Sequence, residues 1–88
     1  MAFEFNFPKY RSLPYNRRER VAQAKHIRQE ARETVHEAVS DDEFAMLVEA
    51  MDTIHAAETL LRPYPHRVLD QAQAEVVRKN EDRGYYSD

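Results

Sequence analysis

Apolar residues recur every three to four positions along three stretches of this chain, and this spacing constrains the fold more than any other feature. Such a period gathers the apolar side chains on one face of a helix. The first helix is predicted over residues 17–39, the second over 41–61 and the third over 66–82. We therefore expect an all-α fold, a short bundle of about three helices.

Helix-capping residues support these boundaries. Asn16 followed by Glu19, and Ser40 followed by Glu43, have the spacing of a capping box, in which each side chain accepts from the other's backbone N–H. The two prolines of residues 62–65 are expected to end the second helix. The helical region is predicted to run from residue 17 to residue 88.

Residues 1–16 are predicted to form an extended arm. Phenylalanine alternates with polar residues at its start, and two prolines interrupt any regular element. Disordered segments are poor in aromatic residues, so this arm is expected to pack on the body of the protein or on a neighbouring subunit. Its aromatic side chains are Phe3, Phe5, Phe7, Tyr10 and Tyr15.

Each helix is expected to turn its apolar side inward. In the first helix these positions are Val21, Ala24, Ile27, Ala31, Val35 and Ala38, and in the third they are Val68, Leu69, Ala72, Val76 and Val77. The second helix is apolar on most of its circumference, which indicates burial against more than one element. A chain this short builds a core worth only about 3 to 5 kcal/mol without further support. We therefore expect oligomerisation to complete the bundle, as a homodimer or a homotetramer.

Composition excludes several classes of function. The chain of 88 residues has no cysteine, so it has no disulfide and no thiolate site, and its single glycine, Gly84, cannot build a phosphate-binding glycine loop. The formal charge of −3 gives no footprint for nucleic acid. No apolar run is long enough to span a membrane, and no secretory signal is recognisable, so we expect a cytoplasmic protein.

Two acidic pairs form the candidate site. Glu30 and Glu33 lie three residues apart on the first helix, and Glu49 and Asp52 have the same spacing on the second. Each pair therefore projects from one helical face, and two antiparallel helices joined near Ser40 can bring the four carboxylates together. Oxygen ligands favour Mg²⁺, with Mn²⁺ as the alternative. The competing interpretation is an ordinary solvated acidic face.

Three further positions carry polar groups of interest near the end of the third helix. Lys79, Asn80 and Arg83 could bind phosphate oxygens, with lysine as a point charge and arginine as a fork. The alternative is that the two basic residues only compensate the helix dipole. His55, one turn after Asp52, is either a partner that orients this carboxylate or a hydrogen-bonded core histidine.

The order of these motifs, from Glu30 and Glu33 through Glu49 and Asp52 to Lys79-Asn80-Glu81-Asp82-Arg83-Gly84, resembles the MazG-like family of all-α nucleoside triphosphate pyrophosphohydrolases, over about residues 20–86. This family also includes phosphoribosyl-ATP pyrophosphohydrolases, whose usual ending differs from Lys79-to-Gly84, so the resemblance favours a general (d)NTP substrate. Residues 17–88 would then be a MazG-like helical domain. The aromatic arm stands where family members often have another helix, and no tryptophan is present to stack a base.

The resemblance implies Mg²⁺-dependent cleavage of a (d)NTP or related nucleotide to a monophosphate and pyrophosphate. It implies that the four carboxylates hold the metal and that Lys79, Asn80 and Arg83 contact the nucleotide. Glu33 is the candidate to orient or deprotonate the attacking water. Two alternatives remain: a phosphoribosyl-ATP pyrophosphohydrolase, and a helical interaction or adaptor protein without catalysis.

Overall fold

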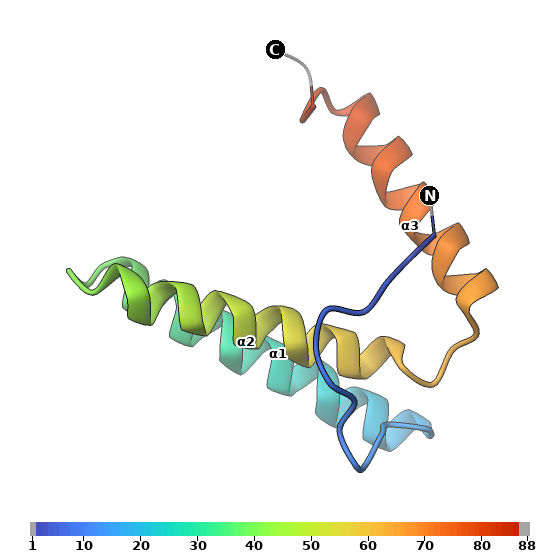
Figure 1. Cartoon of the computed structure of the whole chain (residues 1–88), viewed down its shortest axis with the longest axis horizontal. Coiled ribbons are helices and arrows are strands. Elements are labelled where there is room, and N and C mark those ends of the chain that lie inside the picture. The colour runs from blue at the N-terminus through green and yellow to red at the C-terminus, as the bar shows by residue number, and fades with distance from the viewer. Residues whose placement is uncertain (1, 87–88) are drawn as a thin grey trace.

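The computed structural model describes residues 2–86, and within them it contains three helices and no strand (Figure 1). The helices are α1 (Arg17–Ala38), α2 (Glu43–Leu61) and α3 (His66–Asp82). The expectation of an all-α chain with three helices is confirmed. Residue 1 of the predicted arm and residues 87–88 of the predicted helical region lie outside the described residues.

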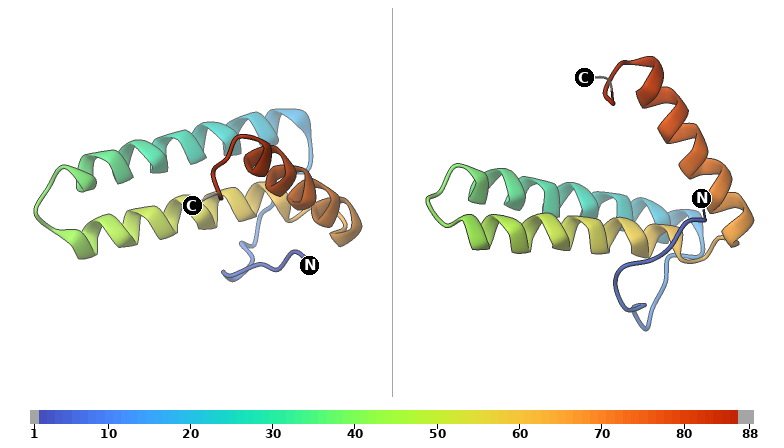
Figure 2. Two further views of the ribbon diagram at one scale, coloured as in Figure 1. Left: turned by 90° about the horizontal axis from the view of Figure 1, so that it is seen from above. Right: turned by 45° about the horizontal axis from the view of Figure 1, so that its top comes forward.

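The first two helices form an antiparallel hairpin, and α3 turns away from its end. Both views of Figure 2 show α1 and α2 side by side along their length, and the right-hand view shows the second half of α3 clear of both. The molecule measures 41 × 40 × 21 Å, so it is broad and thin. None of the helices in residues 2–86 combines the length and the apolar character needed to cross a bilayer.

The start of α1 has the predicted capping box. The Asn16 side chain accepts from the Glu19 backbone N–H at 2.8 Å, and the Glu19 carboxylate accepts from the Asn16 N–H at 3.0 Å. Two backbone donors that the helix itself cannot satisfy are therefore paired. Asn16 is therefore the N-cap residue, and α1 begins at Arg17.

The start of α2 differs from the prediction, because Asp42 caps the helix and Ser40 does not. The Asp42 carboxylate accepts from the Ala45 N–H at 2.9 Å, so α2 begins at Glu43. The Ser40 hydroxyl instead donates to the Glu37 carbonyl at 2.7 Å and closes the last turn of α1. A carboxylate accepts more strongly than a hydroxyl and also suits the positive end of the helix dipole.

Gly84 ends α3. This residue has a φ of 77°, in the left-handed region that side chains disfavour. The Tyr85 N–H donates to the Asn80 carbonyl, and the Gly84 N–H donates to the Glu81 carbonyl, both at 3.0 Å. These two bonds make a Schellman motif, which satisfies carbonyl groups in the last turn.

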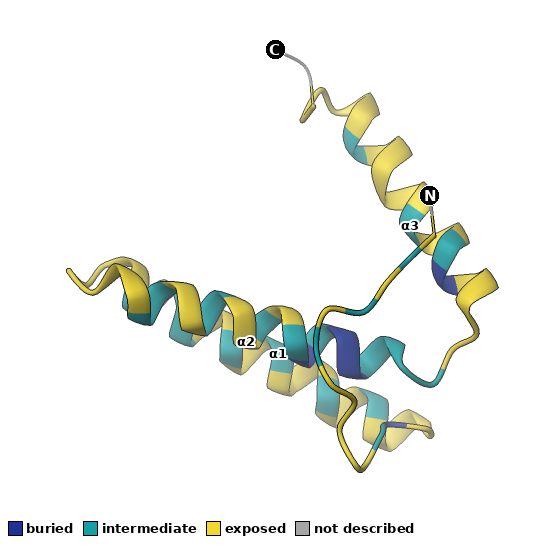
Figure 3. Cartoon of the chain, viewed as in Figure 1, coloured by how far each residue is buried: buried dark blue, intermediate teal, exposed yellow. Residues whose placement is uncertain are grey.

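The predicted inward faces of the three helices are wrong for a single chain. On α1 the positions that face α2 include polar residues such as Gln23 and Thr34, while Val21 and Val35 of the apolar stripe are exposed. The apolar residues of α3 are also exposed, except for buried Leu69. Figure 3 shows that few of the described residues are buried. The buried ones are Pro14, Ala56, Glu58, Thr59 and Leu69.

The second helix likewise does not bury both of its apolar sides. Its outward row remains exposed, with Phe44 at 75% and Met51 at 52%. Only the side toward α1 and the last two turns are covered, because α3 does not pack along the hairpin. The physical reason is the direction in which the Pro63-Tyr64-Pro65 segment carries the chain, which sequence periodicity does not encode.

The N-terminal segment, residues 2–15, crosses the end of α2 without forming a helix or strand (Figure 1). The buried Glu58 carboxylate accepts from the backbone N–H groups of Asn6 and Phe7 at 2.9 to 3.1 Å. The Arg62 guanidinium donates to the Phe7 carbonyl at 2.6 Å and lies 3.8 Å from the centre of the Phe5 ring. The charged side chains of Glu58, in α2, and Arg62, the residue that follows it, therefore hold the backbone of this segment.

Aromatic contacts and one further hydrogen bond complete this attachment. The His55 ring stacks on Phe7, with ring centres 4.9 Å apart, and also contacts Tyr10. At the other end of the segment, the Phe3 N–H donates to the Asp70 carboxylate on α3 at 2.6 Å. The N-terminal segment therefore bridges α2 and α3 within one chain.

Candidate metal centre

The α1–α2 hairpin brings carboxylates of the two acidic pairs together. Glu30 on α1 and Glu49 and Asp52 on α2 each offer a carboxylate oxygen, and these three oxygens lie within 4.8 Å of one another. Glu33 on α1 is close enough to act electrostatically on Glu49. The four predicted ligands therefore share one region along the seam of the hairpin.

Polar contacts at the same seam set the register that aligns the acidic pairs. The hydroxyl groups of Thr34 and Thr53 lie 3.1 Å apart, on opposite helices. The Gln23 amide donates to the Ala56 carbonyl at 2.9 Å, nearer the open end of the hairpin. A shift of either helix by one turn, about 5.4 Å, would break both contacts and separate the carboxylates.

Glu49 is a carboxylate with a raised pKa. Its pKa is raised from the ordinary value of 4.5 by partial burial first, then by the negative charges of Glu33, Asp52 and Glu30. Its Oε2 atom is buried and has no hydrogen-bond donor among the described residues. A proton or a cation would relieve both the crowding of charge and this missing partner.

The donor set fits a hard divalent cation. Carboxylate oxygens from facing helices suit Mg²⁺ or Mn²⁺ better than a soft metal, and the described site contains neither cysteine nor a convergent pair of histidines. Acidic groups also gather on helical surfaces without binding metal. What distinguishes this group is the half-buried position of Glu30, Glu33 and Glu49 between two helices.

The raised pKa of Glu49 predicts how the metal-free protein depends on pH. Because the folded state holds this proton more tightly, Glu49 favours folding below pH 4.5, and that contribution is lost as pH rises through the raised pKa. At pH 7 we expect the free energy of unfolding of Glu49→Gln to exceed that of the wild type. At pH 4 we expect the two free energies to be closer to each other. Urea denaturation at both pH values, with chelator present, measures this difference; an unchanged difference would contradict it.

His26 is a neighbour of the site that the sequence analysis did not identify. Its Nε2 atom lies 3.6 Å from a Glu30 carboxylate oxygen, and the Glu30 side chain is 14% exposed. The two residues are four apart on α1, so helical spacing alone could have signalled the contact. A search for metal-ligand spacing that compares histidines and cysteines only with one another misses this pair, because the partner of His26 is a glutamate.

The three residues predicted to bind phosphate lie away from the carboxylates of their own chain. Lys79 and Arg83 are exposed near the end of α3, and the Asn80 amide donates to the Tyr86 hydroxyl at 3.4 Å. Figure 1 shows this end of α3 apart from the hairpin that carries the acidic pairs. One chain by itself does not bring the two predicted halves of the site together.

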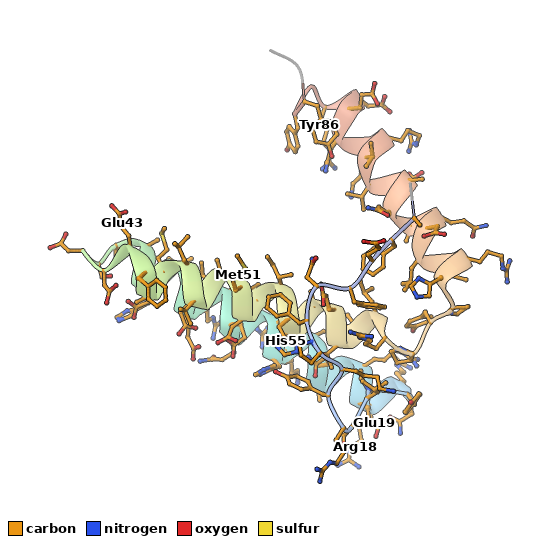
Figure 4. All side chains as sticks on the ribbon, viewed as in Figure 1. Arg18, Glu19, Glu43, Met51, His55 and Tyr86 are labelled. Carbon is orange, nitrogen blue, oxygen red and sulfur yellow. The ribbon has the colours of Figure 1, made fainter. Side chains whose placement is uncertain are left out.

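His55 contacts the N-terminal segment instead of orienting Asp52. Its Nε2 atom lies 3.0 Å from the Pro8 carbonyl oxygen, and its ring is stacked on Phe7 (Figure 4 labels His55). The alternative of a hydrogen-bonded core histidine is closer, although the His55 side chain is only half-buried. Helical spacing put it one turn from Asp52, but the segment packed against α2 provides its partners.

Comparison with known proteins finds no matching family model, no matching curated protein and no matching solved structure. The resemblance to MazG-like pyrophosphohydrolases therefore stays a prediction from motif order.

Proposed function

We propose that this chain is a Mg²⁺-dependent nucleotide pyrophosphohydrolase that cleaves a (d)NTP or related nucleotide to a monophosphate and pyrophosphate. The observation that carries the proposal is the approach of the Glu30, Glu49 and Asp52 oxygens to within 4.8 Å of one another, from two different helices. The order of the acidic pairs and of the Lys79-to-Gly84 ending adds the reaction class. A nucleotide substrate agrees with the cytoplasmic location predicted from the sequence.

In this proposal Glu30, Glu33, Glu49 and Asp52 hold the divalent cation, Mg²⁺ or Mn²⁺. When bound, that cation lowers the pKa of water and offsets phosphate charge. Glu33 lies beside Glu49 and is half-buried, which suits a carboxylate that orients or deprotonates the attacking water. Its half-buried position keeps such a base from being fully solvated.

Substrate binding is proposed for Lys79, Asn80 and Arg83. The two basic side chains are exposed and free to approach phosphate oxygens, while the amide can contact the sugar. Because α3 leaves the hairpin of its own chain, we propose that the working enzyme is a homodimer or homotetramer. Residues of one copy would then act beside the carboxylates of another.

The second candidate is a helical adaptor protein, which the exposed apolar row of α2 favours. An adaptor binds a protein through this row and requires neither metal nor nucleotide. The acidic groups would then only mark a solvated seam. The two candidates differ in a property that is simple to measure, the response of the native state to Mg²⁺.

A thermal melt and a product assay test the proposal together. We expect Mg²⁺ with a non-hydrolysable nucleotide to raise the melting midpoint, since a ligand at 100 times its dissociation constant adds about 2.7 kcal/mol. We also expect pyrophosphate release from a panel of (d)NTPs, with phosphoribosyl-ATP as a separate arm. Ca²⁺ or chelator in place of Mg²⁺ is the control. No shift and no release would favour the adaptor.

A further inference from the structure

The outward face of α2 is an unpartnered apolar row. Phe44, Leu47, Met51 and Ile54 follow one another at intervals of three and four residues and are all exposed. This row lies on the side of α2 away from α1, and Figure 4 shows Met51 projecting from that side. Rows with this spacing are the ones that pack helix against helix. We name these four residues the α2 outer row.

The first half of α3 offers a second apolar surface. Leu69, Ala72 and Val76 line a pocket with Phe3 and Leu61 at the point where α3 leaves the hairpin. Val76 is 47% exposed. The α2 outer row and this part of α3 therefore form the two arms of an open apolar wedge. We name it the α2–α3 wedge.

A buried acceptor at the same pocket lacks a donor. Gln73 lines the pocket, and its Oε1 atom has no hydrogen-bond partner among the described residues. A buried amide oxygen in this state destabilises a protein until a donor is supplied. The wedge thus lacks both apolar cover and one hydrogen bond.

The accessible surface of the chain gives an estimate of the area that an interface would bury. The chain has an accessible surface of 7071 Å², whereas a compact monomer of its mass has about 5,400 Å². The excess is roughly 1,700 Å² per chain, or roughly 3,400 Å² for two chains, which lies within the range of obligate homodimers. The radius of gyration, 14.8 Å, likewise exceeds the value of about 12 Å for a compact domain of this length.

We propose that the α2–α3 wedge is the interface with a second copy of this chain, related by a two-fold axis. The excess area matches what an obligate dimer buries, and a two-fold interface uses the same patch on both copies. The α2 outer row carries no charge, so pairing it with itself opposes no like charges. The two wedges interlock, and each covers the apolar row that the other leaves open.

This inference names the surface of the assembly and does not depend on the proposed hydrolysis. A chain without metal or nucleotide binding would still dimerise through the wedge. Conversely, if an active enzyme assembles through α1, the proposed function holds and the proposed interface is wrong.

Sedimentation and melting of the full chain test the interface. We expect a dimer or a multiple of it at micromolar concentration, with a melting midpoint that rises with protein concentration. Met51→Glu and Val76→Glu, one on each arm of the wedge, should raise the dimer dissociation constant at least about thirtyfold, as expected for a hot-spot residue. Val39→Glu, at a residue that is 82% exposed in the α1–α2 turn, is the matched control and should change neither measurement.

The outcomes separate the possible occupants. If the variants unfold, the concentration dependence of the wild-type midpoint still decides whether a second copy supplies the stability. A wild-type chain that is monomeric at all concentrations, folded or not, overturns the proposal and indicates a different protein as the occupant. An oligomer that both wedge variants leave intact, or that Val39→Glu weakens equally, also overturns it.

Discussion

Replacing Glu49 by glutamine is expected to abolish Mg²⁺-dependent pyrophosphate release and to leave the metal-free protein equally or more stable. The loss should exceed a hundredfold, because even residues that only orient a metal ligand cost about 10- to 100-fold when they are changed. Stability should not fall, because the amide removes a charge that Glu33, Asp52 and Glu30 oppose. Asp52→Asn should lose activity in the same way. Initial rates and urea denaturation with chelator measure the two effects.

Matched substitutions on exposed acidic residues control for the general loss of negative charge. Glu43→Gln, in the first turn of α2, and Asp41→Asn, in the turn before it, remove the same charge away from the acidic pairs. Both should retain activity. If Glu49→Gln keeps pyrophosphate release, or if it unfolds the chain while Glu43→Gln does not, Glu49 is structural and the metal assignment is wrong.

Replacing Glu58 by alanine is expected to release the N-terminal segment and to lower the free energy of unfolding by about 3 kcal/mol, since hydrogen bonds to a buried charged group are worth about 1.5 to 3 kcal/mol each. Glu58 is 6% exposed, and its carboxylate accepts from the N–H groups of Asn6 and Phe7. Hydrogen exchange should show that both amides lose protection. Urea denaturation at one fixed protein concentration measures the free energy.

Glu4→Ala provides the control within the same segment. Glu4 is exposed, so its removal should change stability by no more than about 0.5 kcal/mol. Equal losses for Glu4→Ala and Glu58→Ala would show that the attachment of the segment does not depend on the buried carboxylate. Retained protection of the Asn6 and Phe7 amides in Glu58→Ala would lead to the same conclusion.

The helices and most of their ends follow from local sequence. The capping box of Asn16 and Glu19 and the left-handed Gly84 are interactions among residues within six positions of one another. Local hydrogen bonding and backbone sterics determine them without help from the rest of the chain. The error at Ser40 is also local, because two neighbouring residues could each cap α2 and the carboxylate of Asp42 is the stronger acceptor.

The candidate metal centre was partly predictable for the same reason. The spacing of Glu30 with Glu33, and of Glu49 with Asp52, is enough by itself to place each pair on one helical face. The short turn between α1 and α2 then makes an antiparallel hairpin the simplest arrangement. That the two pairs meet at one level depends on the register of the hairpin, which the Thr34–Thr53 contact shows.

Only the tertiary structure decided what each helix faces. Periodicity identified the apolar stripe of α1, but α1 turns Gln23 and Thr34 toward α2 and leaves Val21 and Val35 exposed. A helical period shows that a face exists and not which neighbour covers it, because burial depends on residues distant in sequence or in another chain. The path of residues 62–65 carries α3 away from the hairpin, and the contacts of Glu58 with the N-terminal segment span more than fifty residues. Local sequence therefore determined the three helices, while packing between distant segments determined the exposed apolar rows and the separation of the acidic pairs from Arg83.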